Sequence, residues 1–274
     1  MTSLGKLPRF LLIGLLAVLA GFPVYWMATT ALSDQDQLYV GRQVPWPQLG
    51  NLGSLLAAIR EVPAGRWMVN SLVIAAGTTV VSLLLGSLAG YALSRFRFRG
   101  RGLVGFLLFM TQVVPEALIL VPLYAMFITL GLLNDLAGLA LANAAFSLPV
   151  ATFIIKGAID TVPYEIEESA QVDNCPRFGI LCMIVLPLVA PSLAAAAVIA
   201  FFAGWNEYLF ASTFLMNREL WPASVGLASF IGQYETPLSV VMGTALLFSL
   251  PAITFFLLIQ RRIVSGLTSG AVKG

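Results

Sequence analysis

The side chains that could do chemistry in this chain are carboxylates, and four of them lie within nine residues. Glu165, Glu167, Glu168 and Asp173 form this acidic cluster in a chain of 274 residues that holds 13 acidic residues and no His. Without His, the chain lacks the commonest metal ligand and the usual proton acceptor near pH 7. Its two Cys residues are too few for a disulfide scaffold or a zinc site. Because the cluster interrupts a chain that is otherwise mostly apolar, it indicates a surface offered to a soluble protein partner; the alternative is a solvated acidic helix without a partner.

The sequence lacks the common motifs of nucleotide-binding and hydrolytic sites. It has no G-x-x-x-x-G-K-[ST] phosphate-binding loop, because its only Gly-Lys pair, Gly5-Lys6, is followed by Leu7. Neither H-E-x-x-H nor G-x-S-x-G occurs. We therefore expect no catalytic residue, metal or cofactor on this chain.

Two further acids, Glu116 and Glu207, lie inside long apolar stretches. Placing an ionisable group in a bilayer is costly, so such a residue is a candidate functional site. Glu207 belongs to the run Trp205-Asn206-Glu207-Tyr208, whose polar groups and rings suit the hydroxyls and apolar faces of a sugar. This run is a candidate transport pathway, and the open alternative is that Glu207 faces a packed interface or the outer headgroup level. For Glu116 we favour that alternative.

The elements that must position these acids are membrane-spanning helices. Apolar residues make up 59% of the chain and charged residues only 10%, with a mean hydropathy of +0.91, whereas soluble domains carry about 25% charged residues. A span needs roughly 20 mostly apolar residues. The sequence predicts an all-α membrane protein with six transmembrane helices, at about 10–32, 67–93, 103–129, 137–158, 183–210 and 238–260.

The basic residues predict the orientation of these spans. Eleven of the 15 Lys and Arg residues fall on the side that holds both termini and the run 95–101. Basic residues favour the cytoplasmic side, so both termini are expected in the cytoplasm, and the 95–101 run is expected to meet anionic lipid. On the outer side, the long loop 33–66 is expected to hold a short amphipathic helix at 51–60. Its aromatic residues suit an interfacial belt, and a docking surface for an outside partner is the alternative.

The acidic cluster is predicted to form a short helix, a sharp turn and a second helix at the cytoplasmic face. Pro163 suits a helix start, and acids in the first turn interact favourably with the helix dipole. Asn174 suits the left-handed stop that ends a helix. Pro176 would open the next helix.

This loop resembles the EAA loop of permeases of bacterial ATP-binding-cassette importers. In that family, Glu-Ala-Ala is followed by Asp-Gly and then by a downstream Leu-Pro. Residues 168–170 (Glu-Ser-Ala) match the first element, 173–174 (Asp-Asn) the second and 186–187 (Leu-Pro) the third, at the family's spacing. Ser169 replaces Ala, and Asn174 replaces the turn Gly while still permitting the turn.

Further runs are similar to the MalG-like carbohydrate branch of that family. They include Tyr91-Ala92-Leu93-Ser94-Arg95 at the end of the second span, the Trp205–Tyr208 run, which is similar to that branch's Trp-Asn-Glu-Phe, and the C-terminal tail 261–274. The resemblance covers nearly the whole chain. It implies the type I ABC importer permease fold, with a cytoplasmic EAA coupling helix at 163–175, in a bacterial plasma (inner) membrane.

The resemblance also implies partners and residue roles. The chain would pair with a second, MalF-like permease subunit, a dimer of ATPase subunits that bind ATP and Mg, and an extracytoplasmic solute-binding protein, and it would bind no nucleic acid. Coupling to the ATPase would involve Glu165, Glu168, Ser169, Ala170, Asp173, Asn174, Leu186 and Pro187, with Glu168 as the contacting acid. The tail residues Thr268, Ser269, Gly270 and Lys273 would reach between the ATPase subunits.

Three functions remain open at this point. The first is a non-catalytic permease subunit that imports a di- or oligosaccharide or a derivative of one. The second keeps the importer but changes the cargo to a sugar phosphate or phosphodiester, for which a basic residue inside a span would argue. The third is a proton-coupled carrier or membrane enzyme, for which the chain offers only the isolated acids Glu116 and Glu207.

Overall fold

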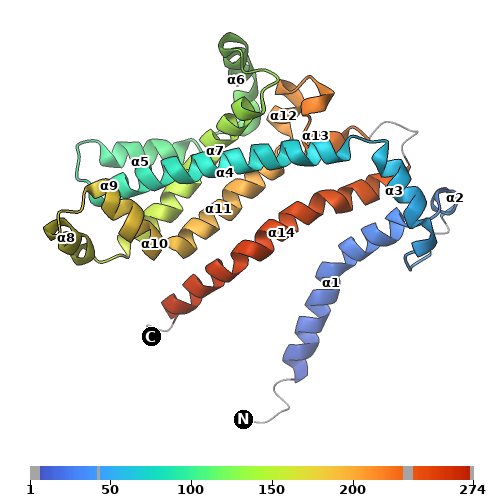
Figure 1. Ribbon diagram of the computed structural model, residues 1–274, viewed down its shortest axis with the longest axis horizontal. Helices are drawn as coiled ribbons and strands as arrows, with labels where there is room; N and C mark the ends of the chain where they lie inside the picture. Colours follow the sequence, from blue (N-terminus) through green and yellow to red (C-terminus); the bar gives the residue numbers. More distant parts are fainter. Residues whose placement is uncertain (1–6, 42–43, 231–236, 272–274) are drawn as a thin grey trace. The chain divides into compact units, whose positions relative to one another are not determined.

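The computed structural model describes residues 7–41, 44–230 and 237–271, and every regular element in them is a helix (Figure 1). The chain divides into two compact units. Unit 1 comprises Met1–Ala64 and Gly226–Leu250, and unit 2 comprises Gly65–Val225 and Pro251–Gly274. Each unit is described by itself.

Unit 1 is built around short helices that follow a long apolar one. The Asn51 amide donates a hydrogen bond to the Leu32 carbonyl at 3.0 Å, and Gly243 lies so close to Leu55 that a Cβ there would come within 2.9 Å of a Leu55 methyl carbon. The amphipathic helix expected at 51–60 corresponds to α3. The elements of this unit are α1 (Leu7–Ala31), α2 (Gln35–Tyr39), η2 (Leu49–Asn51), α3 (Leu52–Arg60) and the first part of α14 (Leu238–Ala271).

Unit 2 holds the residues that the sequence analysis singles out as functional, together with the second part of α14. Its long helices alternate with short ones that cap or connect them. In chain order they are α4 (Ala64–Arg95), α5 (Arg101–Met110), α6 (Glu116–Leu130), α7 (Leu136–Asp160), α8 (Tyr164–Val172), α9 (Arg177–Ile180), η3 (Leu181–Val185), α10 (Leu186–Leu188), α11 (Ala190–Trp205), α12 (Leu209–Phe214), η4 (Arg218–Leu220) and α13 (Ala223–Ala228).

Helices α4, α7 and α11 approach each other closely at glycines. A Cβ on Gly86 would lie 3.1 Å from the Ala151 Cβ, and one on Gly90 would lie 3.1 Å from the backbone of Thr152 and Lys156. A Cβ on Gly204 of α11 would lie 2.8 Å from the Ala75 Cα. Small residues let membrane helices pack backbone to backbone, and Gly86 and Gly90 form a small-x-x-x-small pair, a spacing that predicts such a contact.

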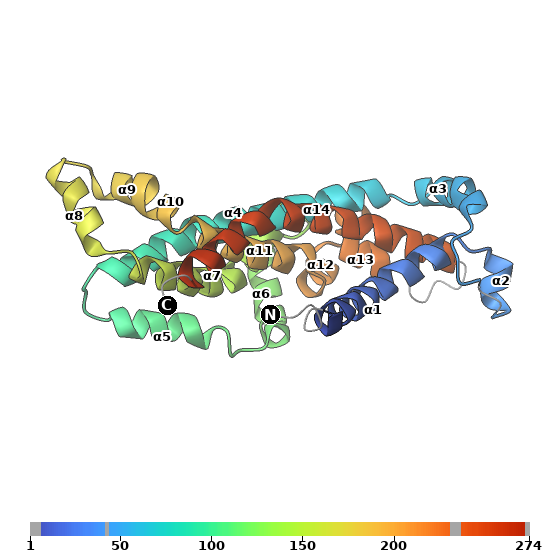
Figure 2. The same ribbon diagram turned by 90° about the horizontal axis from the view of Figure 1, so that it is seen from below.

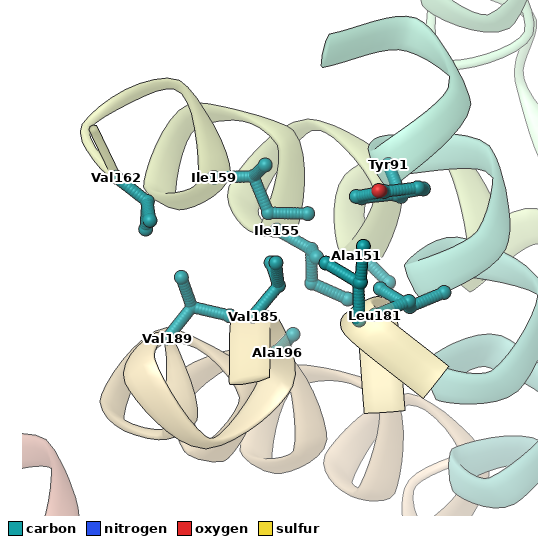
Figure 3. Close-up of a cluster of buried hydrophobic side chains, with 10 residues drawn as sticks. Tyr91, Ala151, Ile155, Ile159, Val162, Leu181, Val185, Val189 and Ala196 are labelled. Carbon is teal, nitrogen blue, oxygen red and sulfur yellow. The ribbon is translucent and has the colours of Figure 1, made fainter. Parts of the chain in front are cut away.

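Two side-chain clusters fill this helix packing at different places. The first joins the last turns of α4 and α7 to η3 and α11, and Figure 3 shows Ile155 and Ile159 of α7 facing Val185 and Val189 across it. The second is aromatic and joins α4, α6, α7 and α12. Its Phe127 and Phe214 rings lie 4.5 Å apart. The two clusters anchor the two regions described below.

Five helices in the described residues are long and apolar enough to span a membrane. The predicted span 103–129 differs from the structure, where α5 and α6 are separate helices with Thr111–Pro115 between them. Pro115 has no N–H to donate and disfavours a helical residue before it, so the helix breaks inside a stretch that hydropathy alone reads as continuous. The count of six spans stays a prediction.

The predicted fifth span and tail also differ in detail. The segment 183–210 begins inside a π-helical turn, η3, and contains a break at Asn206–Tyr208. Pro187 cannot donate to the carbonyl four residues earlier, and this helix widens in the turn just before it. The sequence predicts a span that ends at residue 260 and a separate tail at 261–274. In the structure, α14 continues without a break to Ala271.

Candidate functional site

Helix α8 corresponds to the predicted acidic helix at 163–175, and its ends have the expected chemistry. Pro163 lies at its N-terminal boundary. At the other end, Asn174 adopts the left-handed conformation with φ of 58°, the Cys175 N–H donates to the Ala170 carbonyl at 3.0 Å and the Asn174 N–H to the Gln171 carbonyl at 3.0 Å. This pair of bonds is a Schellman motif. Both views show α8 at one end of unit 2 (Figure 1, Figure 2).

The acids of α8 divide between an exposed and a buried face. Glu165, Glu168 and Asp173 are exposed, as is Ser169, whose hydroxyl donates to the Glu165 carbonyl at 2.8 Å. Ala170 is half-buried. Glu167 is only 1% exposed. The predicted contact acid Glu168 is therefore available to a partner.

Glu167 binds two residues of α4 that lie more than 70 positions earlier in the chain. Its Oε1 accepts from the Arg95 Nε at 2.6 Å, and its Oε2 accepts from the Tyr91 hydroxyl at 2.8 Å. The sequence shows Tyr91 and Arg95 only as part of a family motif and predicts no separate role for Glu167. The spacing of four between Tyr91 and Arg95 places both on one helix face, which was the available signal.

A cavity of about 550 Å³ lies beside this ion pair. Its wall includes Glu167 and four arginines: Arg95, Arg97, Arg101 and Arg177. The Arg177 guanidinium carbon lies 5.2 Å from the centre of the Phe96 ring, in a cation–π contact. The basic run at 95–101 therefore lies beside the N-terminal end of α8.

The downstream residues of the EAA resemblance lie in the connection from α8 to α11. Leu186 packs against the cluster of Figure 3, and Pro187 is exposed in the short helix α10. Among the tail residues, Thr268, Ser269 and Gly270 fall in α14, whereas Lys273 lies outside the described residues.

The run Trp205–Tyr208 divides between a core and a cavity. The Trp205 ring is buried and stacks on Phe201, with 5.9 Å between ring centroids and 10° between planes. Asn206 and Tyr208 are exposed. The four residues that the sequence groups together therefore have different surroundings.

Glu207 caps the helix that follows it. Its Oε1 accepts hydrogen bonds from the backbone N–H groups of Phe210 at 2.6 Å and of Ala211 at 3.4 Å. The Ser224 hydroxyl donates to the Glu207 carbonyl. The buried carboxylate thus takes up the backbone donors at the start of α12, which is the chemistry of a helix N-cap. This geometry agrees with the packed-interface alternative.

A second cavity, of about 470 Å³, brings Glu116 and Glu207 together with Asn206 and Tyr208. Asn143 of α7 also lies in its wall; this residue is 4% exposed, and its Nδ2 has no hydrogen-bond partner in the described residues. The cavity wall holds no Lys or Arg from the described residues. The sequence gives no sign that Glu116 lies near Glu207, and the prediction left out Asn143, an amide in an otherwise apolar span. No group of three or more possible metal ligands occurs in residues 7–41, 44–230 and 237–271.

A family model described as "binding-protein-dependent transport system inner membrane component" matches residues 82–268. This chain belongs to that family. The match runs from the middle of α4 to α14, and it includes α8 and the residues that line the two cavities. As a permease component, the chain is a membrane part of a transport system and not an enzyme, as the sequence predicts.

Curated relatives cover nearly the whole permease. It is 32% identical over 271 residues to a sulfoquinovosyl glycerol transport system permease protein of Agrobacterium fabrum, which covers 98% of this chain and 95% of the relative. It is also 32% identical over 263 residues to a trehalose/maltose transport system permease protein, MalG, of Thermococcus litoralis, covering 95% and 94%. The predicted resemblance to carbohydrate permeases is confirmed.

The fold is that of a known importer. A crystal structure of a bacterial ABC transporter that imports the acidic polysaccharide alginate matches 94% of this chain and 96% of its own, with a TM-score of 0.80 and 22% sequence identity. At that identity the match shows the fold alone. The predicted all-α permease fold of ABC importers is confirmed.

Proposed function

We propose that this permease is one membrane subunit of an ABC importer that carries a di- or oligosaccharide, or a derivative of one, into the cytoplasm. The observation that carries the proposal is α8, a short acidic helix between two apolar helices with an exposed carboxylate face. Two relatives named above are permeases of transport systems for sulfoquinovosyl glycerol and for trehalose/maltose. Both lines of support point to import driven through a partner ATPase.

In this proposal, the exposed face of α8 contacts an ATPase subunit that binds ATP and Mg. Glu168 makes the contact, Glu165 and Ser169 flank it, and the Asn174 turn holds the helix at its angle. Leu186 and Pro187 support the return to α11, and Thr268, Ser269, Gly270 and Lys273 reach toward the ATPase dimer. Movement of α8 then biases the spans between two arrangements.

The remaining partners follow from the family's dependence on a binding protein. A second, MalF-like permease subunit completes the pathway in the lipid bilayer, and a solute-binding protein delivers the cargo from outside. The bias of basic residues supports a cytoplasmic location for both termini, for α8 and for the 163–175 loop.

The cavity at the α11–α12 junction supports a sugar cargo. Asn206 and Tyr208 offer a hydrogen-bonding amide and an exposed ring, which suit sugar hydroxyls and sugar faces. Glu116 and Glu207 add negative charge, and no basic side chain of the described residues lines the wall. A phosphate group is bound most strongly by positively charged side chains, so the sugar phosphate alternative is disfavoured. A proton-coupled carrier is also disfavoured, because the Glu207 carboxylate is already occupied in capping α12.

The test is to purify the tagged permease in mild detergent with its co-expressed partners and to assay ATP hydrolysis. We expect a second permease and an ATPase to co-purify, and Glu168→Lys to release the ATPase while the permease pair persists. Glu61→Lys, which makes the same charge change at an exposed residue of unit 1, should retain the ATPase. A permease that purifies alone, or a Glu168→Lys variant with normal ATPase binding and uptake, would contradict the proposal.

A further inference from the structure

The contacts between α8 and α4 converge on one buried carboxylate. Both oxygens of Glu167 are engaged, by Arg95 at 2.6 Å and by Tyr91 at 2.8 Å, and the side chain is 1% exposed. A group so buried cannot touch another protein. Its charge therefore serves the connection between α8 and α4, in contrast to the exposed Glu168.

Arg95 also binds the chain just before α8. Its Nη2 donates to the Val162 carbonyl at 2.8 Å, and its guanidinium carbon lies 5.7 Å from the centre of the Tyr164 ring. One side chain of α4 thus contacts the entry to α8, its first residue and its buried carboxylate. Charge-assisted hydrogen bonds from a planar guanidinium constrain direction as well as distance, so α8 cannot turn without moving Arg95 or breaking these bonds.

Helix α4 continues from this point toward the second cavity. From Arg95 back to Ile74 it spans roughly 32 Å at 1.5 Å per residue. Ile74 is fully buried in the same aromatic cluster as Phe210, and the Phe210 ring stacks on Phe146, which lines the cavity, at 5.3 Å. One helix therefore contacts both the coupling helix and the packing behind the cavity wall.

We propose that Tyr91, Arg95 and Glu167 fasten α8 to α4, and that α4 is the span that carries the movement of the coupling helix to the cavity. The three residues are positioning residues, since none lines the second cavity and each acts through its bonds to the others. This inference rests on the proposed coupling role of α8. It predicts that loosening the fastening separates ATP hydrolysis from uptake without releasing the ATPase.

The first test measures sugar taken up per ATP hydrolysed by the complete importer in proteoliposomes. Glu167→Gln keeps the side chain's shape and removes its charge, and we expect the ratio to fall on the order of tenfold while ATPase binding and ATPase rate persist. The matched control is Glu61→Gln, which makes the same change at an exposed carboxylate of unit 1 and should leave the ratio unchanged. An unchanged ratio in an assembled Glu167→Gln importer would overturn the inference.

The second test replaces the ion pair with a covalent tether. Arg95→Cys and Glu167→Cys are combined with Cys175→Ser and Cys182→Ser, and the importer is treated with a short bis-maleimide. We expect a low uptake ratio before cross-linking and its recovery afterwards, because the tether restores the connection without restoring charge. Failure to recover in cross-linked, assembled importer would count against a mechanical role.

Two further measurements keep the inference testable and separate it from the proposed function. If Glu167→Gln does not assemble, Tyr91→Phe removes one hydrogen bond and leaves the ion pair, and it should lower the ratio by a smaller factor; an unchanged ratio would again overturn the inference. A wild-type complex without binding-protein-stimulated ATP hydrolysis or uptake would instead refute the proposed function. Normal wild-type coupling with normal Glu167 variants would refute the fastening alone.

Discussion

Glu167 and Glu207 are both buried carboxylates, yet they hold together different kinds of structure. Glu167 binds Arg95 and Tyr91, which lie 72 and 76 residues away in the chain. Glu207 binds backbone N–H groups only three and four residues ahead. The region around α8 is thus held by contacts between distant helices, whereas the α11–α12 junction is held by a local cap.

The two carboxylates differ in whether they can transmit the movement of one helix to another. A local cap fixes the start of one helix and is complete without any other element. An ion pair between helices fixes their relative position and is lost if either helix moves. Burial alone therefore does not identify a functional acid, because the partners decide whether the group serves local folding or connects separate parts.

The largest expected effect is that of Glu167→Ala, which leaves Arg95 buried without its partner. Breaking a buried ion pair from one side costs about 3–5 kcal/mol. We expect a clear fall in the thermal unfolding midpoint of the purified permease in detergent. The control is Glu168→Ala, one residue along and exposed, which should leave the midpoint almost unchanged; equal midpoints for the two variants would contradict the buried role of Glu167.

A smaller and more local effect is expected for Glu207→Ala. Two buried backbone N–H groups lose their acceptor, at a cost of about 1–3 kcal/mol. Hydrogen exchange measured by mass spectrometry should rise at Phe210 and Ala211 and stay unchanged in α8. Glu207→Gln retains an acceptor oxygen and should largely preserve protection. Faster exchange in α8 would contradict the prediction, because it would show that the Glu207 cap also stabilises the region around α8.

Tyr91→Phe removes a single hydrogen bond from the Glu167 cluster and keeps the ring in place. The ring also contacts Phe96 edge-on at 5.8 Å, and that contact is retained. We expect a loss of about 1–2 kcal/mol in unfolding free energy, between the values for wild type and Glu167→Ala. Tyr25→Phe in unit 1, which removes the hydroxyl that donates to the Pro45 carbonyl, is an exposed control. A larger loss for Tyr25→Phe than for Tyr91→Phe would argue against the cluster.

Several features of this fold could be predicted from residue type and spacing. Long apolar runs predicted the helices, the Gly86 and Gly90 spacing predicted a close helix contact, and Asn174 predicted the left-handed stop of α8. Each of these rests on a local property of the chain, either hydropathy, side-chain size or backbone preference. The EAA pattern predicted the family because it combines several such properties at fixed spacing.

Other features could not be predicted, because they depend on contacts between distant residues. Glu165, Glu167 and Glu168 share one short helix, and which of them is buried depends on where Arg95 lies. Glu207 carries the same charge as Glu167, but its cap depends on a helix break at 206–208 that hydropathy does not register. The break at Thr111–Pro115 is different, because it follows from the local effect of Pro115, a signal that hydropathy does not register.

The smallest expected effect is that of Arg66→Gln, which tests whether burial or chemistry sets the strength of an ion pair. Arg66 and Glu219 lie 3.2 Å apart, with side chains 55% and 64% exposed. Water already solvates both charges and salt screens them, so exposed pairs contribute about 0–1 kcal/mol. The same Arg–Glu chemistry at Arg95 and Glu167 is nearly excluded from water. We therefore expect Arg66→Gln to leave the unfolding midpoint within error, with any small difference vanishing in high salt, whereas the Glu167→Ala deficit should persist there. A deficit at Arg66 as large as that at Glu167, or a Glu167 deficit that high salt removes, would mean that burial does not distinguish the two pairs.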